Sequence, residues 1–295
     1  MNLYDAHNHL QDGWLTPHRA AVFADLASVG VRAAVVNGTC ETDWPEVASL
    51  CSQPSTLNLQ LLPSYGLHPW DVGNRTPDWQ KKLLSFLDLP ETTSAAVGQP
   101  TVAVAKVGEI GLDRWILDRA RPDDSRLAGL RRAPIDEQTD VFLWQLALAA
   151  DRNLPASIHC LDAFGLLLDL LRTARHPARG FLLHAYSGPA EMVKPFADLG
   201  AHFSFNGGFL APKNARLCEL YATLPADRLL VETDAPAMRL PPTREEFSLP
   251  PADGGSPINH PANLAATYSA LAALRRTDVD SLAAQVEKNF LRLFG

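Results

Sequence analysis

Short apolar runs alternate with longer segments in which apolar residues recur every three or four positions. The short runs are Leu3–His7, Val31–Asn37, Leu59–Leu67, Thr101–Ile110, Pro155–His159, Gly180–Ala185, Ala201–Asn206 and Arg228–Thr233. The longer segments, which have helical periodicity, are Pro17–Val29, Asp78–Leu87, Ile135–Arg152, Ala163–Ala174, Pro189–Leu199, Asn214–Leu224, Pro261–Leu274 and Asp280–Leu293. Alternating strands and helices are typical of a parallel sheet, and eight such units favour a closed barrel over an open sheet. The pattern therefore predicts an α/β protein with one (β/α)8 TIM barrel over residues 1–295.

Two segments interrupt the alternation. Arg114–Ala133 is rich in Arg and Asp, and Leu240–Pro261 is rich in Pro and Gly. Each follows a predicted strand, which places both at the C-terminal face of the barrel. Long loops at that face are usually either functional lids or disordered segments.

Polar residues stand where several of the apolar runs end. They are His7, His9, Glu109, His159, His184 and Asp234. The first two form an HxH pair, whose side chains point to the same side of a strand. An HxH pair alone is a common coincidence, but the C-terminal ends of barrel strands meet at one rim, which is where such barrels carry their active sites. We therefore expect the six residues to form one metal site at that rim.

The types of these side chains indicate the metal chemistry. Four imidazoles and two carboxylates can hold two divalent ions about 3.5–4 Å apart if one carboxylate bridges them. Glu109 is the expected bridge. His7, His9 and Asp234 are expected to bind one ion with it, and the remaining two histidines the other. Imidazole-rich sites suit Zn, Mn, Fe or Ni better than Ca. We predict two divalent ions, with Zn, Mn or Mg as the candidates.

Nine motifs occur in an order that resembles a known family. They are DAHNHL (Asp5–Leu10), GLHPW (Gly66–Trp70), GEIGLD (Gly108–Asp113), FLWQLALA (Phe142–Ala149), IHCLDA (Ile158–Ala163), HAYSG (His184–Gly188), FSFNG (Phe203–Gly207), ETDAP (Glu232–Pro236) and NFLRLFG (Asn289–Gly295). Together they resemble the amidohydrolase superfamily and, more narrowly, the TatD family of metal-dependent deoxyribonucleases. The resemblance implies a phosphodiesterase that removes nucleotides from the 3′ end of DNA. It also implies that His68 lies beside the substrate phosphate rather than among the metal ligands.

Three departures from the family pattern concern the substrate. Members often carry Arg two residues after the fifth-strand histidine, where this chain has Leu161. The loop after Asp234 is long and poor in basic residues, and it ends in Asn-His-Pro. The segment after Asp113 is also longer than expected and carries six arginines, beginning with Arg114. These arginines either replace the missing phosphate contacts, with Arg114 as the candidate, or form a solvated arm balanced by nearby aspartates.

The expected reaction is phosphodiester hydrolysis by a hydroxide that bridges the two metals. Asp234 is expected to accept the proton of the attacking water as general base, Glu109 to bridge the ions, and His68 to donate to a phosphate oxygen. One alternative is the hydrolysis of a small amide, lactone or aminoacyl ester in the same barrel. A second alternative is a barrel that binds metal or a partner without turnover. Trp14 and Trp70 follow strands, and we expect them to pack beneath loops rather than stack on bases.

Composition limits the setting of this chemistry. The formal net charge of the 295 residues is −7, which argues against a protein that coats nucleic acid by bulk charge. Four cysteines without CxxC spacing favour a reducing compartment. The sequence has no membrane-spanning run, and its first residues, MNLYDAHNHL, do not resemble a signal peptide. We expect a cytoplasmic monomer with DNA as substrate and no obligate protein partner.

Overall fold

Eight parallel strands form one sheet that closes on itself. The computed structural model describes residues 1–53, 58–89, 92–94, 101–252 and 255–295. In spatial order the strands are β1 (Leu3–Asn8), β2 (Val31–Gly38), β3 (Gln60–Tyr65), β6 (Lys106–Asp113), β7 (Ala156–Leu161), β8 (Phe181–Leu183), β9 (Ala201–Asn206) and β10 (Leu229–Glu232). The N–H of Asp234 donates to the His7 carbonyl at 3.0 Å, and that of His9 to the Ala235 carbonyl at 2.8 Å. These bonds join the ends of the first and last strands, and the predicted (β/α)8 barrel is confirmed.

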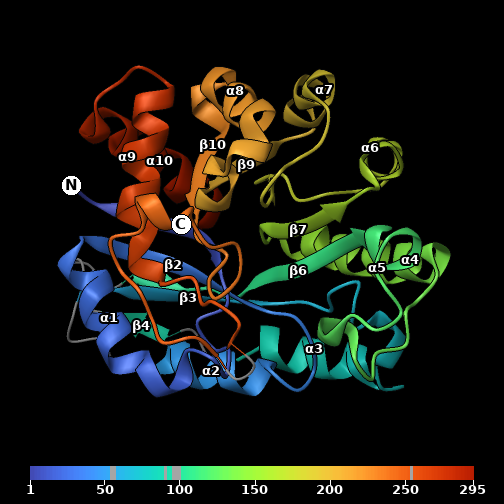
Figure 1. Ribbon diagram of the computed structural model, residues 1–295. Helices are drawn as coiled ribbons and strands as arrows, with labels where there is room; N and C mark the ends of the chain where they lie inside the picture. Colours follow the sequence, from blue (N-terminus) through green and yellow to red (C-terminus); the bar gives the residue numbers. More distant parts are fainter. Residues whose placement is uncertain (54–57, 90–91, 95–100, 253–254) are drawn as a thin grey trace.

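Helices lie outside the barrel strands (Figure 1). They are α1 (Arg19–Ser28), α2 (Trp44–Ser52), α3 (Trp79–Leu87), α4 (Trp115–Asp118), α5 (Ile135–Arg152), α6 (Phe164–Thr173), α7 (Val193–Asp198), α8 (Ala215–Thr223), α9 (Leu264–Leu274) and α10 (Val279–Phe294). Helix α2 was not expected from the periodicity. It has only nine residues, but it buries Trp44, Val47, Leu50 and Cys51 at helical spacing and carries Pro at its first turn. Those features are the signal that identifies it.

The fourth predicted strand, Thr101–Ile110, is wrong at both ends. Its first part, β5 (Thr101–Ala103), pairs antiparallel with β4 (Thr92–Ser94) in a separate two-stranded sheet. The barrel strand β6 begins at Lys106 and extends to Asp113. The apolar run continues across the junction without a turn residue, so periodicity alone does not divide it. At the junction, buried Lys106 donates from Nζ to the Val104 carbonyl at 2.6 Å.

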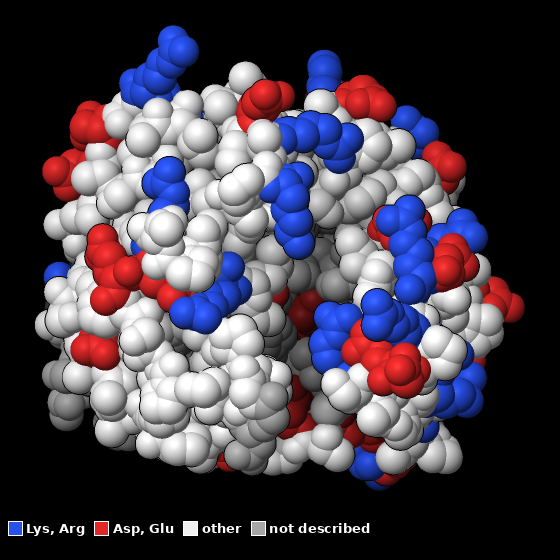
Figure 2. Space-filling view, in the orientation of Figure 1, with Lys and Arg blue, Asp and Glu red and all other residues white. Residues whose placement is uncertain are grey.

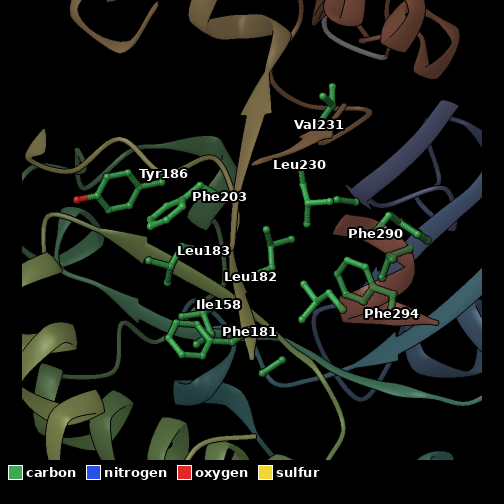
Figure 3. Close-up of a cluster of buried hydrophobic side chains, with 14 of the residues drawn as sticks. Ile158, Phe181, Leu182, Leu183, Tyr186, Phe203, Leu230, Val231, Phe290 and Phe294 are labelled. Carbon is green, nitrogen blue, oxygen red and sulfur yellow. The ribbon is translucent and has the colours of Figure 1, made fainter. Parts of the chain in front are cut away.

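A cluster of buried aromatic and aliphatic side chains spans strands β8, β9 and β10 and the last helix (Figure 3). Phe181 of β8, Phe203 of β9 and Leu230 of β10 are fully buried, as are Phe290 and Phe294 of α10. Burying one such side chain contributes about 1.5–3 kcal/mol. This packing holds the C-terminal helix against the sheet and fixes the strands whose ends carry the polar rim.

Two further features of the described residues concern membrane-spanning helices and the state of the cysteines. Among them, no helix combines the length and the apolar character that crossing a bilayer requires. The cysteines at positions 40, 51, 160 and 218 are all free thiols.

Candidate metal centre

The strand ends bring the six predicted metal ligands together at the rim. His7 lies on β1, Glu109 on β6 and His159 on β7, while His9, His184 and Asp234 directly follow β1, β8 and β10 by one or two residues. Their ligand atoms form two groups with separations below 4.8 Å, one of His7, Glu109 and His184 and one of His7, His9 and Asp234. The strand ends thus bring the six side chains to one rim, and His159 belongs to a further close group with Glu109 and His68.

The two oxygens of Glu109 face different histidines. Its Oε2 atom lies 3.3 Å from Nε2 of His7 and 3.4 Å from Nε2 of His9. Its Oε1 atom lies 2.8 Å from Nε2 of His184 and 3.0 Å from Nδ1 of His159. The carboxylate therefore stands between two imidazole pairs, with one oxygen directed at each.

Asp234 completes the first of these sets. Its Oδ1 atom lies 3.4 Å from Nε2 of His9 and 3.7 Å from Nε2 of His7. Its backbone has a φ of +51°, in the left-handed region that Asp tolerates better than most residues. The hydrogen bond from its N–H to the His7 carbonyl fixes this turn against β1.

The two histidines of β1 are anchored through the nitrogen that faces away from the acids. Nδ1 of His9 lies 2.8 Å from the Asn37 carbonyl, which only accepts, so Nδ1 carries the proton and Nε2 offers a lone pair. Nδ1 of His7 is hydrogen-bonded to Ser157 Oγ at 2.8 Å. In metal sites the far nitrogen of a ligand histidine is held in the same way, which fixes the ring and its tautomer.

Carboxylates face the far nitrogens of the other two histidines. Nε2 of His159 donates to Oδ2 of Asp113 at 3.2 Å, so its Nδ1 atom is the one available to a cation. Nδ1 of His184 lies 3.7 Å from Oε1 of Glu232, which is fully buried and accepts hydrogen bonds from Ser204 and Asn206. All four imidazoles thus present one nitrogen to Glu109 and the other to an oxygen of the surrounding protein.

These residues fit divalent metal. Nε2 of His7 is buried without a hydrogen-bond partner among the described residues, although it faces two carboxylates. Nδ1 of His159 lies only 3.2 Å from Nε2 of His184. A divalent cation would satisfy these converging lone pairs, and the set of imidazoles and carboxylates without sulfur suits a catalytic site better than a structural zinc site.

The charges of the site are strongly coupled. Burial opposes ionisation of Glu109, but the imidazoles of His184, His68 and His7 lower the pKa of its carboxyl group well below the ordinary value. Burial likewise disfavours imidazolium at His9 and His159, yet the neighbouring carboxylates raise the pKa of each to about 9. The metal-free site therefore retains protons, which a bound cation has to displace.

His68 differs from the other four imidazoles in what it presents to Glu109, a proton instead of a lone pair. Its Nδ1 atom accepts a hydrogen bond from the N–H of Trp70 at 3.2 Å, so the proton of the neutral ring lies on Nε2. Nε2 faces Oε1 of Glu109 at 3.4 Å. His68 also belongs to a third close group with Glu109 and His159. Its hydrogen bonding presents a donor to the site, whereas a metal ligand would present a lone pair.

Asp113 was missed as a site residue. It is fully buried at the end of β6, and it accepts hydrogen bonds from Nε1 of Trp70 at 2.6 Å and from the N–H of Ile116 at 3.1 Å. The run GEIGLD contained the signal, since an acid ends an apolar strand there as at the other positions. Ending the strand at Ile110 concealed it.

A cavity of about 690 Å³ opens above the site. Leu161 lines it, and so does Trp14, whose surface is 45% exposed. Trp14 therefore does not pack beneath its loop as expected. Trp70 does pack, against His68 and Trp115.

The segment after β6 places its first arginine away from this cavity. The side chain of Arg114 is half-exposed and lies 3.4 Å from Asp118, and Arg114 is not among the described residues that line the cavity. Arg119 pairs with Asp162 and Arg131 with Glu137. Most of the segment thus resembles the solvated arm that was one of the two expectations.

Known proteins resemble the chain over nearly its full length. A family model described as TatD related DNase matches residues 4–295. The 3'-5' ssDNA/RNA exonuclease TatD of Escherichia coli K12 is 28% identical over 294 residues, 99% of each chain. The protein of the same name from Citrobacter koseri is 31% identical over 231 residues, 78% of this chain and 76% of the relative. The crystal structure of YJJV, a TatD homologue from Escherichia coli K12, has 26% identity and a TM-score of 0.76, covering 99% of this chain and 97% of that one.

Proposed function

Because the chain belongs to the TatD family of metal-dependent nucleases, we propose that it hydrolyses phosphodiester bonds at the 3′ end of single-stranded DNA or RNA with two divalent metal ions. The relatives named as nucleases act on single-stranded DNA and RNA. Their names favour a phosphodiester substrate over the small amide, lactone or aminoacyl ester. The motifs predict DNA as the substrate. We include RNA because the names of these relatives give it as a second substrate.

The position of Glu109 carries the proposal. One of its oxygens faces His7 and His9, and the other faces His159 and His184. A carboxylate placed in this way is suited to bridge two cations. We assign the first pair of histidines to one ion together with Asp234, and the second pair to the other ion. Zn, Mn and Mg are the candidate metals.

Bound ions would activate a water for attack and offset the negative charge that develops on the phosphate. The protein's own residues supply the remaining functions. Asp234, at the edge of the first imidazole pair, is placed to accept a proton from the attacking water. His68 presents its Nε2–H toward the site and would donate to a non-bridging phosphate oxygen.

The remaining expectations about the whole protein stay proposals. We propose that residues 1–295 act as a single domain, because α10 packs against β1 through Tyr4 and Phe290, whose ring centroids lie 4.9 Å apart. A monomeric state, a cytoplasmic location and independence from a protein partner are retained as predictions.

The decisive experiment follows the products of 5′-labelled single-stranded DNA and RNA on a denaturing gel. Purified protein is incubated with each strand in Mg²⁺, Mn²⁺ or Zn²⁺. We expect a ladder that shortens from the 3′ end. A strand that stays intact in every metal, while the protein holds two ions, would mean that the metal site is right and the substrate is wrong.

Two variants accompany the wild-type protein. His7→Ala removes a proposed ligand and should abolish the ladder. His18→Ala removes a histidine at the start of α1, outside the cavity lining, and should leave it unchanged. Loss of cleavage in both would indicate a general effect on folding instead of a specific effect on the site.

A further inference from the structure

One arginine of the segment after β6 differs from its neighbours in position. Among the six arginines of Arg114–Ala133, Arg126 lines the cavity above the metal centre. Arg119 and Arg131 pair with acids and are absent from the described lining, and Arg132 donates to the backbone carbonyls of the segment itself. The segment therefore directs a single guanidinium at the proposed site.

The guanidinium of Arg126 is held in a fixed plane. Nε donates to Oδ1 of Asp124 at 3.0 Å and Nη2 donates to Oδ2 at 2.7 Å. Its central carbon lies 4.9 Å from the ring centroid of Trp115 and 5.8 Å from that of Trp70. Two acceptors and two aromatic rings orient the group, and Nη1 keeps its N–H groups for another partner.

A cation–π contact followed by two hydrogen bonds connects this guanidinium to the metal centre. Trp70, over which it lies, donates from Nε1 to Asp113 at 2.6 Å. Asp113 in turn accepts from Nε2 of His159 at 3.2 Å. Arg126 thus lines the same cavity as Glu109 and His159 and is linked to His159 through Trp70 and Asp113.

The charge of the cavity lining makes this arginine distinctive. The described lining includes five acids, Asp12, Asp43, Asp71, Glu109 and Asp234. Arg126 is the single Lys or Arg among the described residues of that lining. A space-filling view shows a hollow with acidic side chains visible inside it and Lys or Arg at its margin (Figure 2). A polyanionic strand entering this acidic cavity needs a cation beyond the metals, and the lining supplies one.

We propose that Arg126 binds a phosphate of the substrate strand next to the one that is hydrolysed, and so selects a polynucleotide over a small phosphodiester. The neutral Leu161 at the end of β7 lines the same cavity without a charge to offer. Arginine suits the role because its planar fork matches the geometry of phosphate. The inference rests on the proposed nuclease function, and its test distinguishes the failure of one from the failure of the other.

The test compares Arg126→Ala and Arg126→Lys with Arg121→Ala. Arg121 belongs to the same segment, is exposed and is absent from the described lining, so its loss changes net charge equally. Cleavage of single-stranded DNA is measured beside hydrolysis of bis(p-nitrophenyl) phosphate, which has one phosphate. The affinity for a fluorescein-labelled oligonucleotide is measured by anisotropy in EDTA over a range of salt, which requires no turnover.

We expect Arg126→Ala to raise KM for DNA and Kd for the oligonucleotide about tenfold, the usual size of one lost charge-assisted hydrogen bond. The slope of log Kd against log salt should fall by about one unit. The kcat for the small diester should be unchanged. Arg126→Lys should be intermediate, since it keeps the charge and loses the fork. Arg121→Ala should match the wild type.

Each other outcome is informative. If Arg126→Ala and Arg121→Ala give the same KM, Kd and salt slope, the assignment of Arg126 is overturned and the nuclease function stands. If the wild-type protein cleaves neither DNA nor RNA, the nuclease function fails. Anisotropy then still decides whether Arg126 contributes to binding a polyphosphate strand.

Discussion

The Oδ2 atom of Asp113 lies 3.2 Å from Nε2 of His159, on the side of the imidazole ring that faces away from Glu109. Burial opposes ionisation of Asp113, but the hydrogen bond and charge of His159 keep the pKa of its carboxyl group below the ordinary value. An ionised carboxylate at this position fixes the proton on Nε2 and leaves Nδ1 to a cation. Asp113 is therefore a positioning residue for a proposed ligand.

Replacing Asp113 with Asn should weaken metal binding without removing a ligand. The amide is neutral and no longer fixes the tautomer of His159, and losses of such partners commonly cost 10–100-fold in metal affinity. Competition with a fluorescent chelator measures the affinity. Asp118→Asn, which alters an exposed acid of α4, is the matched control. Equal metal affinities in the two variants would show that Asp113 does not position a metal ligand.

Glu109→Gln tests the bridge directly. The amide keeps the shape of the side chain but lacks the charge that two cations would share. We expect the metal content, measured by mass spectrometry of the purified protein, to fall from two ions per chain to one or none. Turnover should fall at least about 100-fold, because charge stabilisation of the transition state is lost. A variant that keeps two ions and wild-type turnover would show that this carboxylate does not bridge.

The positions of the six rim residues could be predicted because they depend on strand ends. In a parallel barrel every strand ends at the same rim, so an acid or histidine that ends an apolar run is placed by the fold itself. The presence of His7 and Asp234 at one site requires no knowledge of side-chain packing. It requires that β1 and β10 be neighbours, which closure of the barrel ensures.

Features set by packing could not be predicted in the same way. The apolar run around Lys106 contains no turn signal, and only the pairing of β5 with β4 divides it. The tautomer of His68 depends on one hydrogen bond from Trp70. Which arginine of the segment after β6 faces the cavity depends on Asp124 and two tryptophan rings, and a charge pattern does not encode this.

Trp14 should contribute to binding of single-stranded substrate. It is half-exposed and lines the cavity, so part of its side chain is accessible to a base. Base–aromatic stacking is worth about 1–3 kcal/mol, which corresponds to roughly 5–150-fold in KM. We expect Trp14→Ala to raise KM for DNA by such a factor and Trp14→Phe to retain most of the affinity. An unchanged KM for DNA in Trp14→Ala would show that Trp14 does not stack on the substrate.

His202 should make the free energy of unfolding fall in acid. It is buried on β9, and burial together with Arg228 and Arg292 lowers the pKa of its imidazole from 6.5 to about 4. The unfolded chain therefore binds a proton below pH 6.5 that the folded chain does not accept until about pH 4. Stability is lost as the pH falls through this window, by about 3 kcal/mol for this residue.

Urea unfolding at pH 7 and pH 4 measures this loss. His202→Leu has no proton to bind, so it should lose about 3 kcal/mol less than the wild type between the two pH values. Carboxylates elsewhere in the chain contribute equally to the loss in both proteins, so their contribution cancels when the two losses are subtracted. Equal losses in the two proteins would show that folding does not lower the pKa of His202.

Metal removal should lower the melting temperature of the wild-type protein. Ions that bind only the folded chain stabilise it by mass action, by about 2.7 kcal/mol at a free concentration one hundred times Kd. For a chain of this size each kcal/mol shifts Tm by roughly 2 °C. We expect EDTA to lower Tm by about 5 °C and added Mn²⁺ or Zn²⁺ to restore it. In His7→Ala the difference between EDTA and metal should become clearly smaller, because the ion assigned to His7, His9 and Asp234 loses its buried nitrogen ligand while the other ion keeps both of its histidines. In His18→Ala it should persist. A variant at position 7 that still responds fully to metal would place the ions elsewhere.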